Sequence, residues 1–153
     1  MWQVVGHERA VSLLTLGMGK GTIPHAYLFT GQPHVGKMTL AIDLARAVNC
    51  AGNAAPCGEC ENCRRISRGK HSDVQIISLT EDKNHTKLQK DISIEQIRDI
   101  QRQVNLPPFE GKYRVFIIND ADRFSIEAAN CLLKTLEEPA GRVVFILLAT
   151  DDR

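Results

Sequence analysis

The feature that most limits the fold of this chain is a glycine-rich loop that ends in a lysine. It reads Gly31-Gln32-Pro33-His34-Val35-Gly36-Lys37 and lies between an apolar run at 26–30 and an apolar-periodic segment at 37–49. In such a loop, inward-pointing backbone N–H groups and the N-terminus of the following helix bind phosphate. The motif therefore predicts a P-loop between a strand and a helix, with Lys37 reaching the β- and γ-phosphates of a nucleotide.

The rest of the chain continues this alternation of strands and helices. We expect further strands at 74–79, 114–118 and 143–149, and further helices at 8–18, from the N-cap Ser93 to Pro107, and from the N-cap Ser125 to just before Pro139. Strands that alternate with helices predict a mainly parallel, doubly wound α/β sheet with helices on both faces. The 153 residues fit one domain. Because the chain stops directly after the last strand, we expect it to be part of a longer protein.

Composition excludes some classes of protein. The net charge is +1, so no global charge draws the chain to nucleic acid or to a membrane. The N-terminus lacks the pattern of a signal peptide, and no apolar run approaches the roughly 18 residues of a spanning helix. We therefore expect a cytoplasmic protein, in which the five cysteines do not form stable disulfides.

Four of the five cysteines are clustered in a glycine-rich insert at 50–63. Cys50, Cys57, Cys60 and Cys63 have the spacing C-x6-C-x2-C-x2-C. Four soft thiolates favour a structural, tetrahedral Zn²⁺ site, which leaves no open position for catalysis. An iron–sulfur cluster and free thiols are the alternatives. The fifth cysteine, Cys131, is expected in or near the core.

Two positions depart from the pattern of an active P-loop enzyme. Met38 follows the lysine where a Ser or Thr hydroxyl should bind Mg²⁺, and Thr39 should face elsewhere on the helix. Asn119-Asp120 follows the strand at 114–118, where an Asp should hold the metal and a Glu should polarise water. Both substitutions weaken support for the same ion, so we expect nucleotide binding with weak or absent hydrolysis. The alternative for Asn119-Asp120 is a polar loop without catalytic function.

Two basic residues are candidates for contact with DNA. Arg98 and Arg102 lie four residues apart on the expected helix from Ser93, away from its apolar side. On the residues alone, a solvated helix face is the better interpretation.

Several segments are similar, in the same order, to segments of one known family. They are Val5-Gly6-His7, Pro24-His25-Ala26-Tyr27-Leu28-Phe29-Thr30-Gly31, the cysteine insert, Ile94-Glu95-Gln96-Ile97-Arg98, Ala128-Ala129-Asn130-Cys131-Leu132-Leu133-Lys134-Thr135-Leu136-Glu137-Glu138-Pro139 and Phe145-Ile146-Leu147-Leu148-Ala149-Thr150. Together they resemble the N-terminal AAA+ domain of bacterial clamp-loader subunits of DNA polymerase III, over essentially the whole chain. The resemblance implies that the four clustered cysteines bind zinc and that Thr150 is the sensor-1 residue, which reads the γ-phosphate. It also implies that Val4 and Val5 lie near the adenine and that the helix carrying Arg98 faces primer-template DNA.

The substitutions distinguish two subunit types within that family. The gamma/tau type is the motor and normally keeps its Mg²⁺ ligands, whereas the delta-prime type is often degenerate, so Met38 and Asn119 favour delta-prime. The implied function is to help load the sliding clamp on primed DNA, together with gamma/tau and delta subunits, in the cytoplasmic replisome. The implied cofactors are Zn²⁺ and ATP or ADP, with Mg²⁺ in doubt. The alternatives are a gamma/tau-type ATPase motor and a zinc-stapled nucleic-acid-binding module with a vestigial P-loop.

Overall fold

The computed structural model describes residues 2, 6–19, 24–31, 36–52, 56–78, 92–137 and 142–150. Its elements are, in chain order, α1 (Glu8–Gly19), β1 (Ala26–Thr30), α2 (Lys37–Asn49), α3 (Glu61–Ser67), β2 (Val74–Ile77), α4 (Ile94–Val104), β3 (Arg114–Ile118), the 3-10 turn η1 (Ala121–Arg123), α5 (Ile126–Glu137) and β4 (Val143–Ala149). None of the helices among these residues is long and apolar enough to span a membrane.

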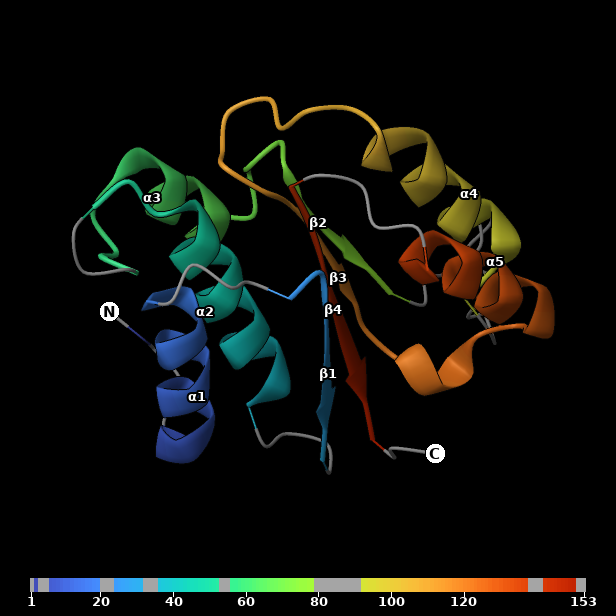
Figure 1. The fold of residues 1–153 in the computed structure, drawn as a ribbon, viewed down its shortest axis with the longest axis horizontal. Coiled ribbons are helices and arrows are strands. Elements are labelled where there is room, and N and C mark those ends of the chain that lie inside the picture. Colours follow the sequence, from blue (N-terminus) through green and yellow to red (C-terminus); the bar gives the residue numbers. More distant parts are fainter. Residues whose placement is uncertain are drawn as a thin grey trace.

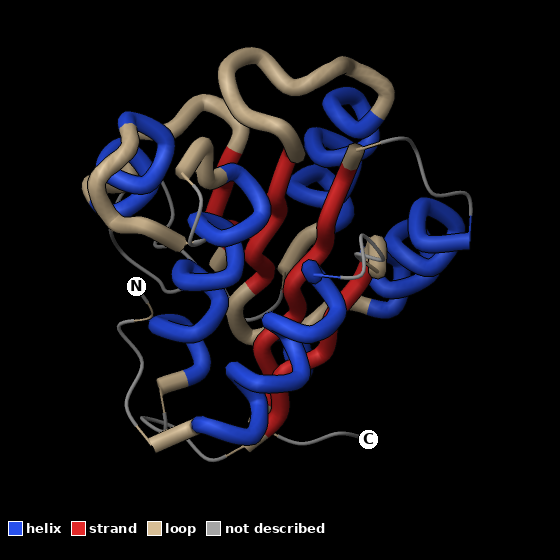
Figure 2. Tube along the Cα trace, turned by 60° about the vertical axis from the view of Figure 1, so that its left-hand side comes forward, coloured by secondary structure: helices blue, strands red, loops and turns tan. Residues whose placement is uncertain are grey.

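The four strands form one parallel sheet in the order β1-β4-β3-β2. Helices cover both of its faces, with α1, α2 and α3 on one side and α4 and α5 on the other (Figure 1). Figure 2 shows the same layers from another direction, with the strands between the two groups of helices. The predicted parallel, doubly wound sheet is therefore confirmed.

Each face of the sheet has its own buried core, because successive strand residues point to opposite sides. The core under α2 contains Leu44 and Val48 with Ile117 of β3 and Ile146 of β4. The core under α4 and α5 is formed mainly by Ile92, Ile97, Ile100, Phe116, Ile118, Ala128, Leu132, Val143 and Phe145. Phe116 and Phe145 are register partners on β3 and β4, and their rings stack with centroids 5.4 Å apart.

The helix starts agree with the expected caps. The Ser93 side chain accepts from the backbone N–H of Gln96, and the Gln96 side chain accepts from the backbone N–H of Ser93, which completes a capping box. The Ser125 hydroxyl accepts from the N–H of Ala128 at 3.1 Å. Helix α4 ends at Val104 and β2 ends at Ile77, both earlier than expected. Helix α3 was not expected at all, and the polar stretch at 80–91 lies outside the described residues.

Two buried polar side chains fix the loop that leads from α4 into β3. The Asp73 carboxylate accepts from the backbone N–H groups of Phe109, Glu110 and Gly111, at 2.6, 2.7 and 2.7 Å. These contacts hold the loop against the start of β2.

The second of these side chains is that of Asn49, the last residue of α2. Its Oδ1 accepts from the backbone N–H groups of Lys112 and Tyr113, both at 2.7 Å. The ammonium of Lys112 also donates to the carbonyl of Cys50, at 2.8 Å. The loop is therefore tied both to the start of β2 and to the C-terminal end of α2.

Candidate functional site

The carboxyl ends of β1 and β4 meet at the start of α2. The Lys37 ammonium donates to the carbonyl of Gly31, just after β1, at 2.7 Å. It also donates to the carbonyl of Ala149, the last residue of β4, at 2.8 Å. Gly36 precedes α2 in the left-handed conformation, with φ 93°, which favours glycine. The predicted loop residues Gln32, Pro33, His34 and Val35, and the predicted adenine neighbours Val4 and Val5, lie outside the described residues.

A cavity of about 570 Å³ opens at this edge of the sheet. It is lined by Gly36, Lys37, Met38, Thr39, Asn119, Asp120, Leu148 and Thr150. Thr39 was expected to face elsewhere on the helix, and that expectation is wrong, because Thr39 lines the same cavity as Met38. The described residues that the sequence assigned to the P-loop helix, the acidic strand end and sensor 1 therefore surround one space. A smaller cavity of about 270 Å³, lined mainly by apolar residues of α1, β1 and α2, shares Gly36 and Lys37 with it.

Asn119 and Asp120, which occupy the expected acidic positions, form a tight turn directly after β3. The side-chain oxygen of Asn119 accepts from the backbone N–H of Asp120 at 3.1 Å. Asp120 itself has φ 57° and ψ 41°, a left-handed conformation that non-glycine residues seldom adopt. This turn directs the chain into η1.

One carboxylate at this edge was not among the predicted site residues. Asp122 of η1 accepts a hydrogen bond from the Thr150 hydroxyl, with 2.7 Å between the oxygens. This bond, more than any other contact, holds the pKa of Asp122 below its ordinary value, and the charge of Lys37 lowers it further. Asp122 is therefore ionised near neutral pH.

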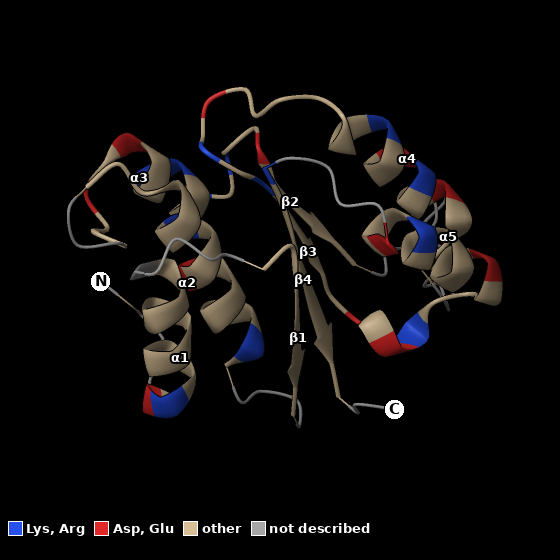
Figure 3. Cartoon of the chain, viewed as in Figure 1, with Lys and Arg blue, Asp and Glu red and all other residues tan. Residues whose placement is uncertain are grey.

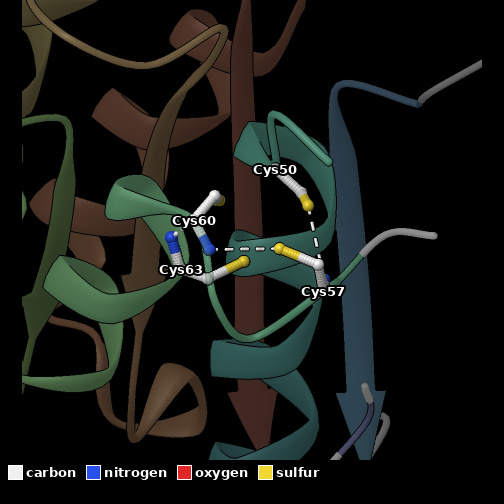
Figure 4. A group of neighbouring side chains, drawn as sticks. All are labelled: Cys50, Cys57, Cys60 and Cys63. Carbon is white, nitrogen blue, oxygen red and sulfur yellow. Dashed lines mark hydrogen bonds between the residues drawn. The ribbon is translucent and has the colours of Figure 1, made fainter. Parts of the chain in front are cut away.

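The four clustered cysteines converge between the C-terminus of α2 and the start of α3 (Figure 4). Their sulfur atoms all lie within 4.8 Å of one another. Sulfur atoms around a tetrahedral Zn²⁺ lie about 3.8 Å apart, as bond lengths of ~2.3 Å require. A small contraction of the cluster would suffice to bind the ion, so the residues fit a tetrathiolate metal site.

Backbone N–H groups point at the cysteine sulfurs, as thiolate ligands require. Cys50 Sγ accepts from the N–H groups of Gly52 and Cys57, at 3.2 and 3.3 Å. Cys57 Sγ accepts from the N–H groups of Cys60 and Glu59, at 3.2 and 3.4 Å. These two bonds, together with smaller effects of the Cys50 and Cys60 thiols, lower the pKa of Cys57 to about 6. Burial dominates at Cys63 and raises the pKa of its thiol to about 12. A bound cation would favour the thiolate at all four positions.

The two candidate DNA-contacting residues are on the outer face of α4. Arg98 is exposed, and Arg102 is exposed and paired with Asp99 at 2.6 Å. Figure 3 shows that basic and acidic residues are interspersed along α4 and α5. The predicted exposure of both arginines is confirmed, and their role stays a prediction.

Comparison with known proteins gives the family. The sequence model described as "DNA polymerase III, delta subunit" matches residues 6–153, nearly the whole chain. The chain belongs to this family. The resemblance found from the motifs is thereby confirmed at the level of the family.

Curated relatives of this DNA polymerase III family member include tau subunits. The chain is 39% identical to DNA polymerase III subunit tau of Salmonella typhimurium over 97% of its own length, and it covers 22% of that protein. It is 38% identical to the tau subunit of Bacillus subtilis, again over 97% of the chain and 25% of the relative. The chain thus spans about a quarter or less of the length of these relatives.

Two solved structures share the fold. One is a DNA polymerase III gamma subunit-related protein from Thermotoga maritima, with a TM-score of 0.62 and 23% identity over 90% of this chain and 39% of that one. The other is a mutant of RuvB from Thermotoga maritima, with a TM-score of 0.51 and 14% identity over 95% of this chain and 39% of that one. At these identities the likeness concerns the fold alone.

Sequence reasoning missed Asp122 because its partner Thr150 is 28 positions away. A signal was nevertheless present. Both residues follow apolar strands closely, and β3 and β4 are neighbours in the parallel sheet. Polar residues in the loops after adjacent parallel strands lie at the same edge of the sheet, so this strand order places Asp122 and Thr150 close together.

Proposed function

We propose that this chain is the nucleotide-binding AAA+ domain of a clamp-loader subunit of DNA polymerase III, with residues 50–63 as a zinc-binding insert. The full protein would help to load the sliding clamp on primed DNA. The observation that carries the proposal is the cavity of about 570 Å³ in which Lys37, Asn119 and Thr150 meet. Family membership supports the replication context.

The domain binds ATP or ADP and hydrolyses ATP weakly or not at all. Lys37 and the N-terminus of α2 supply positive charge for the phosphates, and the adjoining apolar cavity offers room for the base. The Met38 thioether is a poor ligand for Mg²⁺, and Asn119 is neutral where a carboxylate should hold the ion. These substitutions favour a delta-prime type of subunit. The second candidate, a gamma/tau-type ATPase motor, is favoured by the identity to tau subunits.

The metal is a structural Zn²⁺ held by Cys50, Cys57, Cys60 and Cys63. When bound, it would join the C-terminus of α2 to the start of α3, and its four protein ligands leave no position for a substrate. The backbone N–H groups directed at the sulfurs support thiolate ligands.

The partners proposed for the full protein are other clamp-loader subunits of the gamma/tau and delta types, the sliding clamp, and primed DNA, all in the cytoplasm. Arg98 is the better candidate for a phosphate contact, because Arg102 is already paired with Asp99.

A third candidate function is a zinc-stapled nucleic-acid-binding module in which the P-loop has no ligand.

Nucleotide titration separates these candidates. The chain, with Lys37→Ala and the matched surface variant Lys134→Ala, would be titrated with ATP and ADP, with and without Mg²⁺, and assayed for phosphate release. Binding that is lost in Lys37→Ala alone, without turnover, is the expected result. Turnover that depends on Lys37 would establish the motor instead, and equal failure of all three proteins to bind would leave the nucleic-acid-binding module.

A further inference from the structure

The hydrogen bond between Asp122 and Thr150 joins the loops that follow two neighbouring strands. Asp122 lies in η1 after β3, and Thr150 directly follows β4. The bond length of 2.7 Å is that of a strong bond from a hydroxyl to a carboxylate. Thr150 also lines the larger cavity beside Lys37, so the pair touches the space proposed for the phosphates.

The backbone holds Asp122 in this place from both sides. Asp120 turns the chain through its left-handed conformation, and its carbonyl accepts from the N–H of Arg123 at 2.9 Å. The carbonyl of Arg123 in turn accepts from the N–H of Ile92, a fully buried residue, at 2.8 Å. Backbone hydrogen bonds that reach a buried residue therefore hold η1 in addition to the bond of the Asp122 side chain.

This arrangement decides what Thr150 can offer to a ligand. A threonine hydroxyl has one proton to donate, and an ionised carboxylate can only accept. With its proton given to Asp122, the hydroxyl presents only lone pairs to the cavity. Oxygens of a γ-phosphate are also acceptors and are negatively charged, so they find no donor at Thr150 and a second negative charge directly behind it.

We propose that Asp122 is a positioning residue that acts through Thr150 to disfavour nucleotides that carry a γ-phosphate, relative to the diphosphate. The inference rests on the proposed function, because it requires that the cavity binds nucleotide. The Asp122 carboxylate would thus set the relative affinity of the cavity for the triphosphate and the diphosphate.

The test compares affinities for ADP and for a non-hydrolysable ATP analogue, both titrated to the 153-residue chain in buffer without added Mg²⁺ and without a chelator, so that the cysteine cluster keeps any bound metal. Asp122→Ala should raise the affinity for the analogue relative to ADP by about tenfold, the effect of gaining one hydrogen bond to a charged group. The gain should vanish in the double variant Asp122→Ala with Thr150→Val, because it depends on the freed hydroxyl. The control is Asp99→Ala, which removes an equal charge from the exposed face of α4.

A purely structural role for Asp122 would change the thermal midpoint but not the ratio of the two affinities. Asp122→Leu keeps the branched shape of the side chain without a hydrogen-bond acceptor, and it replaces Asp122→Ala if thermal scans show that the latter unfolds. An unchanged ratio overturns the inference, as does a gain that persists without the Thr150 hydroxyl. If the unmodified chain binds neither nucleotide, the proposed function fails and the inference with it. If it binds both and the ratio stays fixed, only the inference fails.

Discussion

Replacing Asp73 by alanine should be among the most damaging single changes to this domain. The carboxylate is fully buried and accepts three backbone N–H groups at 2.6–2.7 Å, with the Arg114 guanidinium 3.8 Å away. Bonds to a charged acceptor each contribute about 1.5–3 kcal/mol, and removing one partner of a buried ionic group costs about 3–5 kcal/mol. In the variant, water can bind some of the N–H groups of Phe109, Glu110 and Gly111 that Asp73 leaves unpaired. We therefore expect the free energy of unfolding to fall by about 3 kcal/mol, at the lower end of this range.

The loss should depend on pH in a defined direction. Burial alone would raise the pKa of Asp73, but the N–H groups of Phe109, Gly111 and Glu110, with the charge of Arg114, outweigh burial and lower it. A depressed folded-state pKa means that the stabilisation is present above the unfolded value, about 3.9, and disappears as the pH falls through the folded value. The difference between the native chain and Asp73→Ala should therefore be largest near neutrality and shrink in acid.

Urea unfolding followed by circular dichroism measures this difference. With a slope of about 2 kcal/mol/M, a loss of ~3 kcal/mol lowers the midpoint by about 1.5 M at pH 7. The control Asp99→Ala removes an exposed carboxylate with an arginine partner and should cost about 0.5 kcal/mol. Equal effects of the two substitutions, or a difference that grows in acid, would refute the reasoning.

Three further changes test the contacts at the C-terminal end of α2, where Asn49 and the cysteine cluster lie. A metal chelator should lower the thermal midpoint of the native chain, and equally that of the control Cys131→Ser, which keeps all four clustered cysteines. It should not lower the midpoint of Cys57→Ser, because elemental analysis should find little metal in that variant even before chelation. Asn49→Ala removes the acceptor of two backbone N–H groups and should cost about 2 kcal/mol in urea unfolding, and a cost near zero would contradict the tether. Gly52→Ala places a Cβ 3.0 Å from that of Cys57, so zinc affinity should fall while the far-ultraviolet spectrum is unchanged.

The fold was largely predictable because its two central strands, β3 and β4, are buried on both faces. Such strands read as short apolar runs between turn residues, and β1, β3 and β4 occupy the predicted residues. Helix α3 was missed for two physical reasons. At seven residues it is too short to show a period, and its N-cap is Cys60, whose sulfur accepts from the N–H of Cys63 in place of an oxygen.

The candidate site was predictable where a motif is local and unpredictable where it depends on tertiary contact. Lys37 and the four cysteines follow from spacing within one segment. The tethers of Asn49 and Asp73 involve backbone groups 36 or more positions away, which leave no trace in composition or periodicity. The backbone conformation of Asp120 was also not predictable, because its residue type does not reveal that a residue other than glycine is left-handed.

Helix α2 separates the cavity from the contacts that fasten the loop before β3. Its 13 residues span about 20 Å, from Lys37 at the cavity to Asn49, next to Cys50 of the cysteine cluster. The contacts of Asn49 fasten the loop before β3, whereas the cavity-lining residues Met38 and Asn119 are remote from that loop. A change of side chain at Asn119 therefore leaves the contacts of Asn49 untouched. Under the proposed function, nucleotide turnover could thus be lost while the loop before β3 stays fastened to the rest of the domain.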